Sequence, residues 1–202
     1  MPPTAPIPAG RGGDQKIPRP YSARPGGPPP WVDLPPDRRC PTVADVRAAL
    51  ADLGPARPSQ RALLDGAPRP GRPSAVLAPI YDDAVEIGGV LTVGAHVVLT
   101  RRTWGLRTHR GEVSFPGGRV DDGESPVDGA RREAEEEIAL DGTHVEIIGE
   151  LDHLATVTSR SFIVPYVGAL PEGRPETVAN PAEVSAVLHV PVSELLDPAI
   201  YR

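Results

Sequence analysis

The chain has 202 residues, which is enough for one folded domain with extensions. Its 27 acidic residues outnumber the 21 Lys and Arg, and the formal net charge of -6 argues against a general nucleic-acid binder. A single cysteine, Cys40, and the lack of both a membrane-length apolar run and a hydrophobic signal core favour a reducing, cytoplasmic location without a membrane partner.

The first third of the chain is predicted to lie outside the main domain. Residues 1–40 are rich in Pro and Gly and poor in large apolar side chains, so we expect a disordered or polyproline-like tail. Residues 41–73 are expected to form a helical extension and a linker. A helix is predicted over 42–53, because Thr42 and Asp45 have the spacing of a capping box.

From residue 74 to residue 202 the sequence is rich in β-forming runs separated by glycines. The run between residues 85 and 101 is expected to form a hairpin or two strands, with Gly88-Gly89 and Gly94 as breaks. The predicted strands cover 74–80, 85–101, 113–115, 145–151, 161–170 and 184–190, and short helices are predicted at 60–64 and 193–196. Because one longer helix lies among the strands, we expect an α/β (α+β) domain over 74–202 with a mixed sheet sandwiched between helices.

The longer helix belongs to the stretch GGRVDDGESPVDGARREAEEEIAL, residues 117–140. Pro126 suits the first helical position, and Ser125 suits the N-cap before it. The next stop signal is Asp141-Gly142. The helix is therefore expected to begin at Pro126 and to end before this stop.

Three carboxylates of this helix share one face. Glu133, Glu136 and Glu137 stand at i, i+3 and i+4, so their side chains crowd together and repel one another. A cation among them would relieve the repulsion, and hard divalent ions such as Mg²⁺ and Mn²⁺ prefer oxygen ligands. A solvated charged helix is the ordinary explanation for a Glu-rich run, and these glutamates alone leave it open.

The turn before the helix also suits an ion-binding site. Gly117-Gly118 follows a short predicted strand, so the backbone there is able to approach an ion or a phosphate closely. Glu124 precedes the helix, and Arg132 lies beside the acidic face. A salt bridge between Glu124 and Arg132 would hold the loop and the helix in register.

This spacing resembles the signature of the Nudix hydrolase family, the Nudix box. The family pattern is Gly, five residues, Glu, seven residues, then Arg-Glu-aliphatic-any-Glu-Glu-any-Gly-aliphatic. The matching residues are Gly118, Glu124, Arg132, Glu133, Ala134, Glu136, Glu137 and Leu140. Ala139 departs from the pattern, because the family has a Gly there that helps to end the helix.

The resemblance implies the Nudix fold and a metal-dependent hydrolase. It makes Glu133, Glu136 and Glu137 ligands of Mg²⁺ or Mn²⁺, with the carbonyl group of Gly118 as a further ligand. The residues implied in catalysis are Glu124, Arg132, Glu133, Glu136 and Glu137.

The implied reaction is hydrolysis of a nucleoside diphosphate linked to another moiety, with water attacking one phosphorus in line. Metal ions would lower the pKa of the water and neutralise charge on the diphosphate. The residue that takes the proton stays open between Glu136 and two glutamates outside the box, Glu150 and Glu183.

A second signature lies just upstream, in LTRRTWGLRTHRGEVSFPGGRVD, residues 99–121. It is similar to the extra motif of the coenzyme A pyrophosphatase branch of the family, although Val98 and Thr103 replace the usual Leu and Ser. The matching residues are Leu99, Thr100, Arg102, Leu106, His109, Gly111, Val113, Phe115, Pro116, Gly117, Gly118 and Asp121. The likeness to this branch extends over about residues 74–198, and it implies coenzyme A or a derivative as the substrate.

Basic side chains in this motif suit such a substrate, because guanidinium groups match phosphate geometry. His109 would either donate to a phosphate oxygen or make a structural hydrogen bond that holds the loop before Gly111. A polar run, Thr156, Thr158 and Ser159, is expected to border the pantetheine or nucleotide pocket. The residues predicted to bind substrate are Arg101, Arg102, Arg107, His109 and Arg110.

Other functions remain open from the sequence. The substrate would instead be ADP-ribose, NADH or a (deoxy)nucleoside triphosphate if branches of the family overlap in specificity. A non-catalytic nucleotide-binding or regulatory module is the alternative of another class, and an unrelated acidic helical interaction module is a more distant one.

The end of the chain and its assembly are also undecided. Nudix domains normally close with a further helix, and the sequence stops at Arg202 where such a helix would begin. Three explanations stay open: the domain lacks this helix, another element supplies that layer, or the sequence is a piece of a longer protein. A nucleotide is the expected small-molecule partner, nucleic acid is not, and a homodimer stays open.

Overall fold

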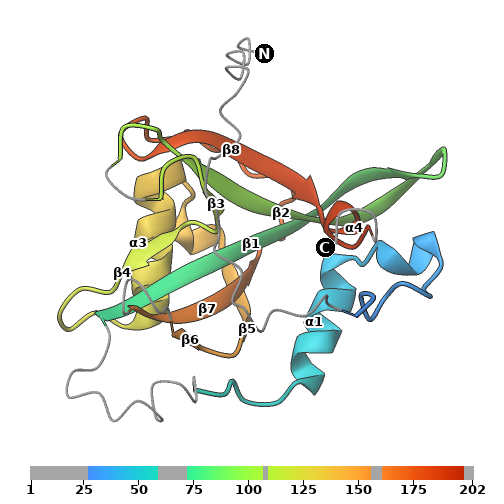
Figure 1. Ribbon diagram of the computed structural model, residues 1–202, viewed down its shortest axis with the longest axis horizontal. Helices are drawn as coiled ribbons and strands as arrows, with labels where there is room; N and C mark the ends of the chain where they lie inside the picture. The colour runs from blue at the N-terminus through green and yellow to red at the C-terminus, as the bar shows by residue number, and fades with distance from the viewer. Residues whose placement is uncertain (1–26, 59–71, 107–108, 156–160, 198–202) are drawn as a thin grey trace.

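The computed structural model describes residues 27–58, 72–106, 109–155 and 161–197 (Figure 1). Several predictions fall outside these ranges: the first 26 residues of the tail, the short helix at 60–64, Arg107, and the polar run Thr156, Thr158 and Ser159. Within the described part of the chain, no helix is long and apolar enough to cross a membrane.

The centre of the molecule is a mixed sheet, as the sequence predicted, and in the described residues it has eight strands. The strands run in the order β3-β2-β1-β7-β5, and β4 pairs with β1, β6 with β7, and β8 with β2. The pair β1–β7 is parallel, and the other pairs are antiparallel. The strands are β1 Arg72–Ile87, β2 Val90–Arg102, β3 Val113–Ser114, β4 Gly117–Arg119, β5 Glu146–Glu150, β6 Leu154–Ala155, β7 Ser161–Ala169 and β8 Val184–Pro191.

Two predicted breaks in the first strands are wrong. β1 does not stop at Ile80 but continues to Ile87, because residues 80–87 pair with residues 90–97 of β2 in a long hairpin. Its two-residue turn, Gly88-Gly89, has positive φ at both positions, as tight hairpin turns require. β2 runs straight through Gly94, where the missing side chain leaves room for the sulfur of Cys40, 2.5 Å from an ideal Cβ position.

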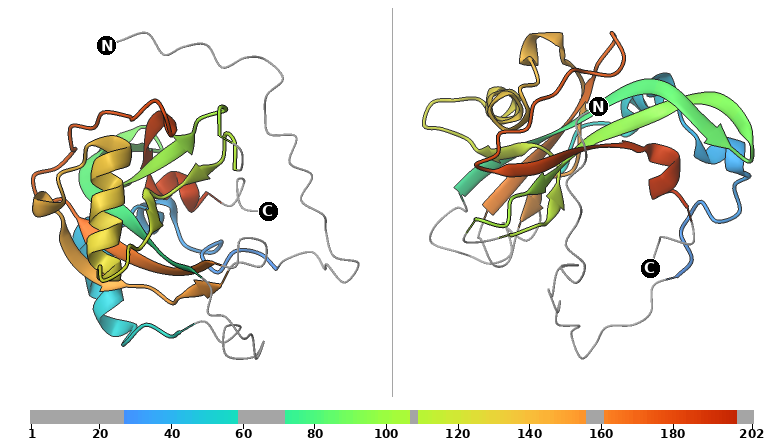
Figure 2. Two further views of the ribbon diagram at one scale, coloured as in Figure 1. Left: turned by 90° about the vertical axis from the view of Figure 1, so that its left-hand side faces the viewer. Right: turned by 90° about the horizontal axis from the view of Figure 1, so that it is seen from above.

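Two helices cover opposite faces of the sheet (Figure 1, Figure 2). The helix α3, Pro126–Ile138, packs on one face through Ala130, Ala134 and Ile138. The helix α1, Val43–Asp52, covers the other face through Val46 and Leu50. The small alanines of α3 let this helix approach the strands closely, which places its neighbouring glutamates at the sheet.

The ends of α1 follow the local sequence. Thr42 is the N-cap, and the predicted capping box with Asp45 is present in both directions. Ahead of this helix, the stretch Pro36–Arg39 forms a short 3-10 helix, η1, so the prediction of disorder up to residue 40 does not hold there. The remaining helical pieces are η2 Gly142–His144 and α4 Val192–Leu195.

The ends of α3 explain the one departure from the Nudix box. The helix begins at Pro126 after the N-cap Ser125, as predicted. It ends at Ala139, which has φ 55° and ψ 30°, the left-handed conformation that a C-terminal glycine normally adopts. Ala139 therefore keeps the backbone geometry of the family's glycine, at the expense of strain in a residue with a Cβ.

We predict that Ala139→Gly stabilises the protein. Removing the left-handed strain is expected to raise the free energy of unfolding by about 0.5–1 kcal/mol, measured by urea denaturation. The matched control is Glu135→Gly at an exposed position inside the same helix, which is expected to lower it by about 1 kcal/mol. Equal destabilisation by both substitutions would contradict this account of the helix end.

Candidate functional site

The glycine turn and the glutamate helix of the Nudix-box match meet where β4 pairs with β1. Gly117 pairs with Val76 of β1 and has φ 152°, and a Cβ on it would stand 2.4 Å from the carbonyl oxygen of Ala75. A Cβ on Gly118 would stand 2.4 Å from the carboxyl carbon of Glu133. Only glycine allows these approaches, so the turn brings the backbone of Gly118 against the carboxylate of α3.

Glu137 is the most deeply buried acid of the site, with 4% of its side chain exposed. Gly117 N donates to its Oε2 at 3.3 Å, and Arg102 Nη1 lies 3.6 Å from its Oε1. Burial raises the pKa of Glu137 to about 7, and the negative charges of Glu133 and Glu183 act in the same direction. The desolvation of this carboxylate therefore outweighs the stabilisation of its charge by Gly117 and Arg102.

The three glutamates of the predicted face are not equivalent. Glu133 is 17% exposed, and burial raises its pKa, with Glu136 and Glu183 adding to the rise and Arg132 opposing it. The side chain of Glu136 is 59% exposed. Glu133 and Glu137 therefore form the inner part of the site, and Glu136 lies at its rim.

Arg132 ties the loop to the helix, as the sequence predicted. Its Nε lies 3.0 Å from Glu124 Oε1, and its Nη2 donates to the carbonyl oxygen of Arg119 at 2.8 Å. Its Nη1 lies 3.1 Å from Glu133 and 3.2 Å from Glu136. Hydrogen bonds from Arg132 lower the pKa of Glu124, so this carboxylate is held ionised as a structural partner.

The arginines predicted to bind substrate lie in different surroundings. Arg102 Nη1 lies near Glu137, whereas Arg101 Nε donates to Ser185 Oγ at 3.1 Å. Arg110 Nε donates to the carbonyl oxygen of Leu106 within the loop between β2 and β3. Only Arg102 of these three has its guanidinium group among the box glutamates.

His109 makes the structural contact that was one of its two predicted roles. Its Nδ1 lies 2.7 Å from Glu112 Oε2, and its backbone has a φ of 57°. This pair closes the loop just ahead of Gly111. A role of His109 in binding phosphate remains a prediction.

The inner residues fit a hard divalent cation by their chemistry. As the side chains stand, no three acids, histidines or cysteines in the described ranges gather closely enough to hold a metal ion. The donors are nevertheless carboxylate oxygens beside a glycine cradle, and the desolvated Glu137 would be stabilised by a positive ion. Gly118, Glu133 and Glu137 would hold such an ion, with Glu136 at the rim.

A segment far from the box in sequence completes the site. Val178 N donates to Ile138 O at 2.9 Å and Asn180 N donates to Glu137 O at 2.8 Å, so this segment satisfies carbonyls at the end of α3. The turn then places Glu183 near the inner acids, with Glu183 N donating to Asn180 O at 3.0 Å. Of the two outside glutamates considered as bases, Glu183 is at the site.

Glu150, the other outside candidate, forms a pair with His153 in the chain after β5. The signal that could have favoured Glu183 is the Asn-Pro-Ala sequence before it. Asn180 Oδ1 accepts from Ala182 N at 3.2 Å, which is the local turn that asparagine commonly makes.

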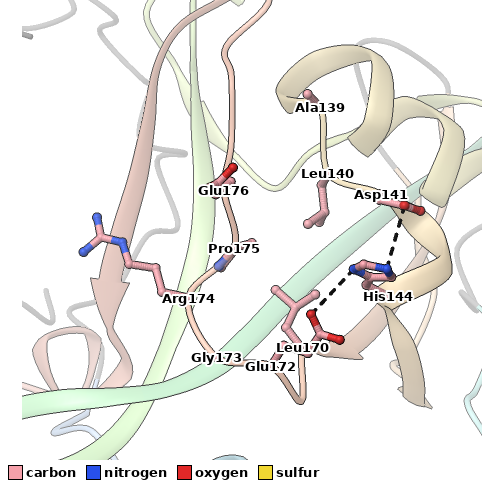
Figure 3. Close-up of a pocket in the computed structure, with 10 residues that line it drawn as sticks. All are labelled: Ala139, Leu140, Asp141, His144, Leu170, Glu172, Gly173, Arg174, Pro175 and Glu176. Carbon is pink, nitrogen blue, oxygen red and sulfur yellow. Dashed lines mark ion pairs between the residues drawn. The ribbon is translucent and has the colours of Figure 1, made fainter.

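A separate pocket of about 390 Å³ lies beyond the C-terminal end of α3 (Figure 3). In this pocket, His144 Nε2 lies 4.0 Å from Asp141 Oδ2, and His144 Nδ1 lies 3.8 Å from Glu172 Oε2. None of the predicted site residues lines this pocket, so it is distinct from the candidate site.

Comparison with known proteins agrees with the architecture. A family model described as NUDIX domain matches residues 72–201. Nudix hydrolase 3 of Caenorhabditis elegans is 42% identical over 105 residues, covering 51% of this chain and 44% of that protein. A Nudix hydrolase named NudL, of Escherichia coli (strain K12), is 44% identical over 101 residues, covering 50% of this chain and 52% of that protein.

Among solved structures, the Nudix hydrolase RenU of M. smegmatis aligns with a TM-score of 0.47 and 21% identity, covering 62% of this chain and 74% of that chain. The chain spans about half the length of the curated relatives it matches.

The raised pKa of Glu137 predicts a pH-dependent stability in the metal-free protein. Between the ordinary value of 4.5 and the folded value of about 7, the folded state holds a proton that the unfolded state releases. The free energy of unfolding should therefore fall as pH rises through this window, by on the order of 3 kcal/mol.

Glu137→Gln should lack this decline, so in EDTA it should be more stable than the wild type at pH 8, with the difference vanishing near pH 4.5. Urea denaturation at several pH values measures the free energy of unfolding of each variant. Glu135→Gln is the control, and its stability should depend on pH as that of the wild type does. Parallel profiles for Glu137→Gln and the wild type would contradict the assignment.

Proposed function

Because the chain belongs to the Nudix family, we propose that it hydrolyses the diphosphate bond of coenzyme A or its derivatives in a reaction that depends on Mg²⁺ or Mn²⁺. The products would be adenosine 3′,5′-bisphosphate and 4′-phosphopantetheine. The observation that carries the proposal is the approach of Glu133 to Gly118 and of Glu137 to Gly117, with Arg102 beside Glu137. This combines carboxylates for a cation with a guanidinium group for a phosphate.

The substrate class rests on the second signature, residues 99–121. Its described residues include the end of β2, β3 and β4, and Arg102 from this segment lies beside Glu137. A diphosphate bound over the glutamates would therefore lie within reach of the same segment. This arrangement supports coenzyme A as the first substrate to test.

The proposed mechanism assigns separate tasks to the side chains. A divalent cation, when bound, would polarise the diphosphate and acidify water. Gly118, Glu133 and Glu137 would hold this cation, and the Arg132–Glu124 pair keeps the helix in register with the turn. Glu183, whose charge acts on both inner glutamates, is our candidate for accepting the proton of the attacking water.

A product assay tests the function. The full chain is incubated at mildly alkaline pH with coenzyme A and Mg²⁺ or Mn²⁺, and in parallel with ADP-ribose, NADH and dNTPs, with EDTA controls. We expect the two coenzyme A products only when metal is present. Cleavage of another substrate alone would reject coenzyme A and keep the chemistry, and binding of nucleotide without any turnover would favour a non-catalytic module.

Substitution of the inner glutamate tests the site. Glu137→Gln is expected to lower kcat by roughly 10²–10³-fold, because the amide cannot supply the negative charge that the reaction requires. Glu136→Gln is expected to remove most turnover as well. The control is Glu135→Gln on the same helix, which should retain activity, and survival of turnover in both Glu136→Gln and Glu137→Gln would reject these assignments.

A further inference from the structure

Hydrogen bonds fix the backbone of Arg102, whereas its guanidinium group makes a long ion pair with Glu137. The backbone N–H of Arg102 donates to Glu112 O at 2.9 Å, and its carbonyl oxygen accepts from Gly111 N at 3.2 Å. Both bonds belong to the loop that returns from β2 to β3. Any change in the position of the charge must therefore come from the side chain, which is 25% exposed.

A bulge in β8 separates Arg102 from the arginine before it. Arg101 pairs with Ala186 and Arg102 pairs with Val184, so Ser185 occupies the extra position between them. Ser185 Oγ accepts from Arg101 Nε at 3.1 Å and donates to Arg101 O at 3.1 Å. Bulges commonly redirect side chains next to functional sites, and here Arg101 is held at the strand pair while Arg102 faces Glu137.

The contact between Arg102 and Glu137 is loose for a buried ion pair. The distance from Nη1 to Oε1 is 3.6 Å, well beyond the roughly 2.7–2.9 Å of a charge-assisted hydrogen bond. Arg102 Nε is buried without a hydrogen-bond partner. The pair thus neutralises charge without the bonds that would lock the guanidinium group in place.

We infer that Arg102 is a resident counter-ion of Glu137 that leaves the carboxylate when a divalent cation binds and turns its guanidinium group to the substrate diphosphate. This inference rests on the proposed function. Two positive groups within a few ångströms of one carboxylate repel, so the cation and Arg102 compete for Glu137. Arg102 then keeps a negative partner by moving to a phosphate, whose oxygens suit its planar fork.

Competition predicts that Arg102 weakens metal binding in the absence of substrate. Mn²⁺ affinity of the full chain is measured by electron paramagnetic resonance of the free ion, without nucleotide. Arg102→Gln should bind Mn²⁺ roughly tenfold more tightly than the wild type, since a repelling charge is removed. Arg102→Lys should retain the wild-type affinity, and Arg102→Gln should raise the KM for the diphosphate substrate.

The matched control is Arg101→Gln, which removes the same charge from the neighbouring residue and should leave Mn²⁺ affinity unchanged. Circular dichroism melts check that all variants are folded. Unchanged or weaker Mn²⁺ binding by Arg102→Gln, or tighter binding by Arg102→Lys, would overturn the inference.

Glu137→Gln separates this inference from the proposed function. If Glu137→Gln weakens Mn²⁺ binding while Arg102→Gln has no effect, only the counter-ion role fails. If Glu137→Gln binds Mn²⁺ as the wild type does, the metal assignment of the proposed function fails together with the counter-ion role.

Discussion

The burial of one carboxylate, that of Glu137, is the constraint on which the rest of the site depends. A charge removed from water is unfavourable unless donors or cations surround it. The protein supplies one backbone N–H from Gly117 and one loosely placed guanidinium group from Arg102. These two groups do not offset the desolvation of the carboxylate, so a further positive charge beside it would be stabilising.

Packing of α3 makes this burial happen. The helix contacts the sheet through Ala130, Ala134 and Ile138, and two of these are small enough to bring the helix axis close to β1 and β4. In β4, a side chain on Gly117 would collide with the backbone of β1, and a side chain on Gly118 would collide with the carboxylate of Glu133. Small residues on both surfaces therefore decide how close the acids and the backbone come.

The site also depends on chain segments that are remote in sequence. The segment after β7 caps α3 through backbone bonds to Glu137 and Ile138, and the start of β8 carries Glu183 to the inner acids. β2 contributes Arg102, whose guanidinium group lies 3.6 Å from the carboxylate of Glu137. The order of the strands brings Arg102 and Glu183 to the site, because β8 pairs with β2 and β2 pairs with β1.

The sequence by itself determined the features that local chemistry controls: the start of α3 at Pro126, the capping box of α1, the Arg132–Glu124 pair and the positions of most strands. Helical spacing placed Glu133, Glu136 and Glu137 on one face, but it could not tell which of them is buried. Only the tertiary structure decided that Glu137 is inside and Glu136 at the rim, and that Arg102 and Glu183 join them. The physical reason is that desolvation depends on what packs against a helix, and here the packing residues come from strands dozens of positions away.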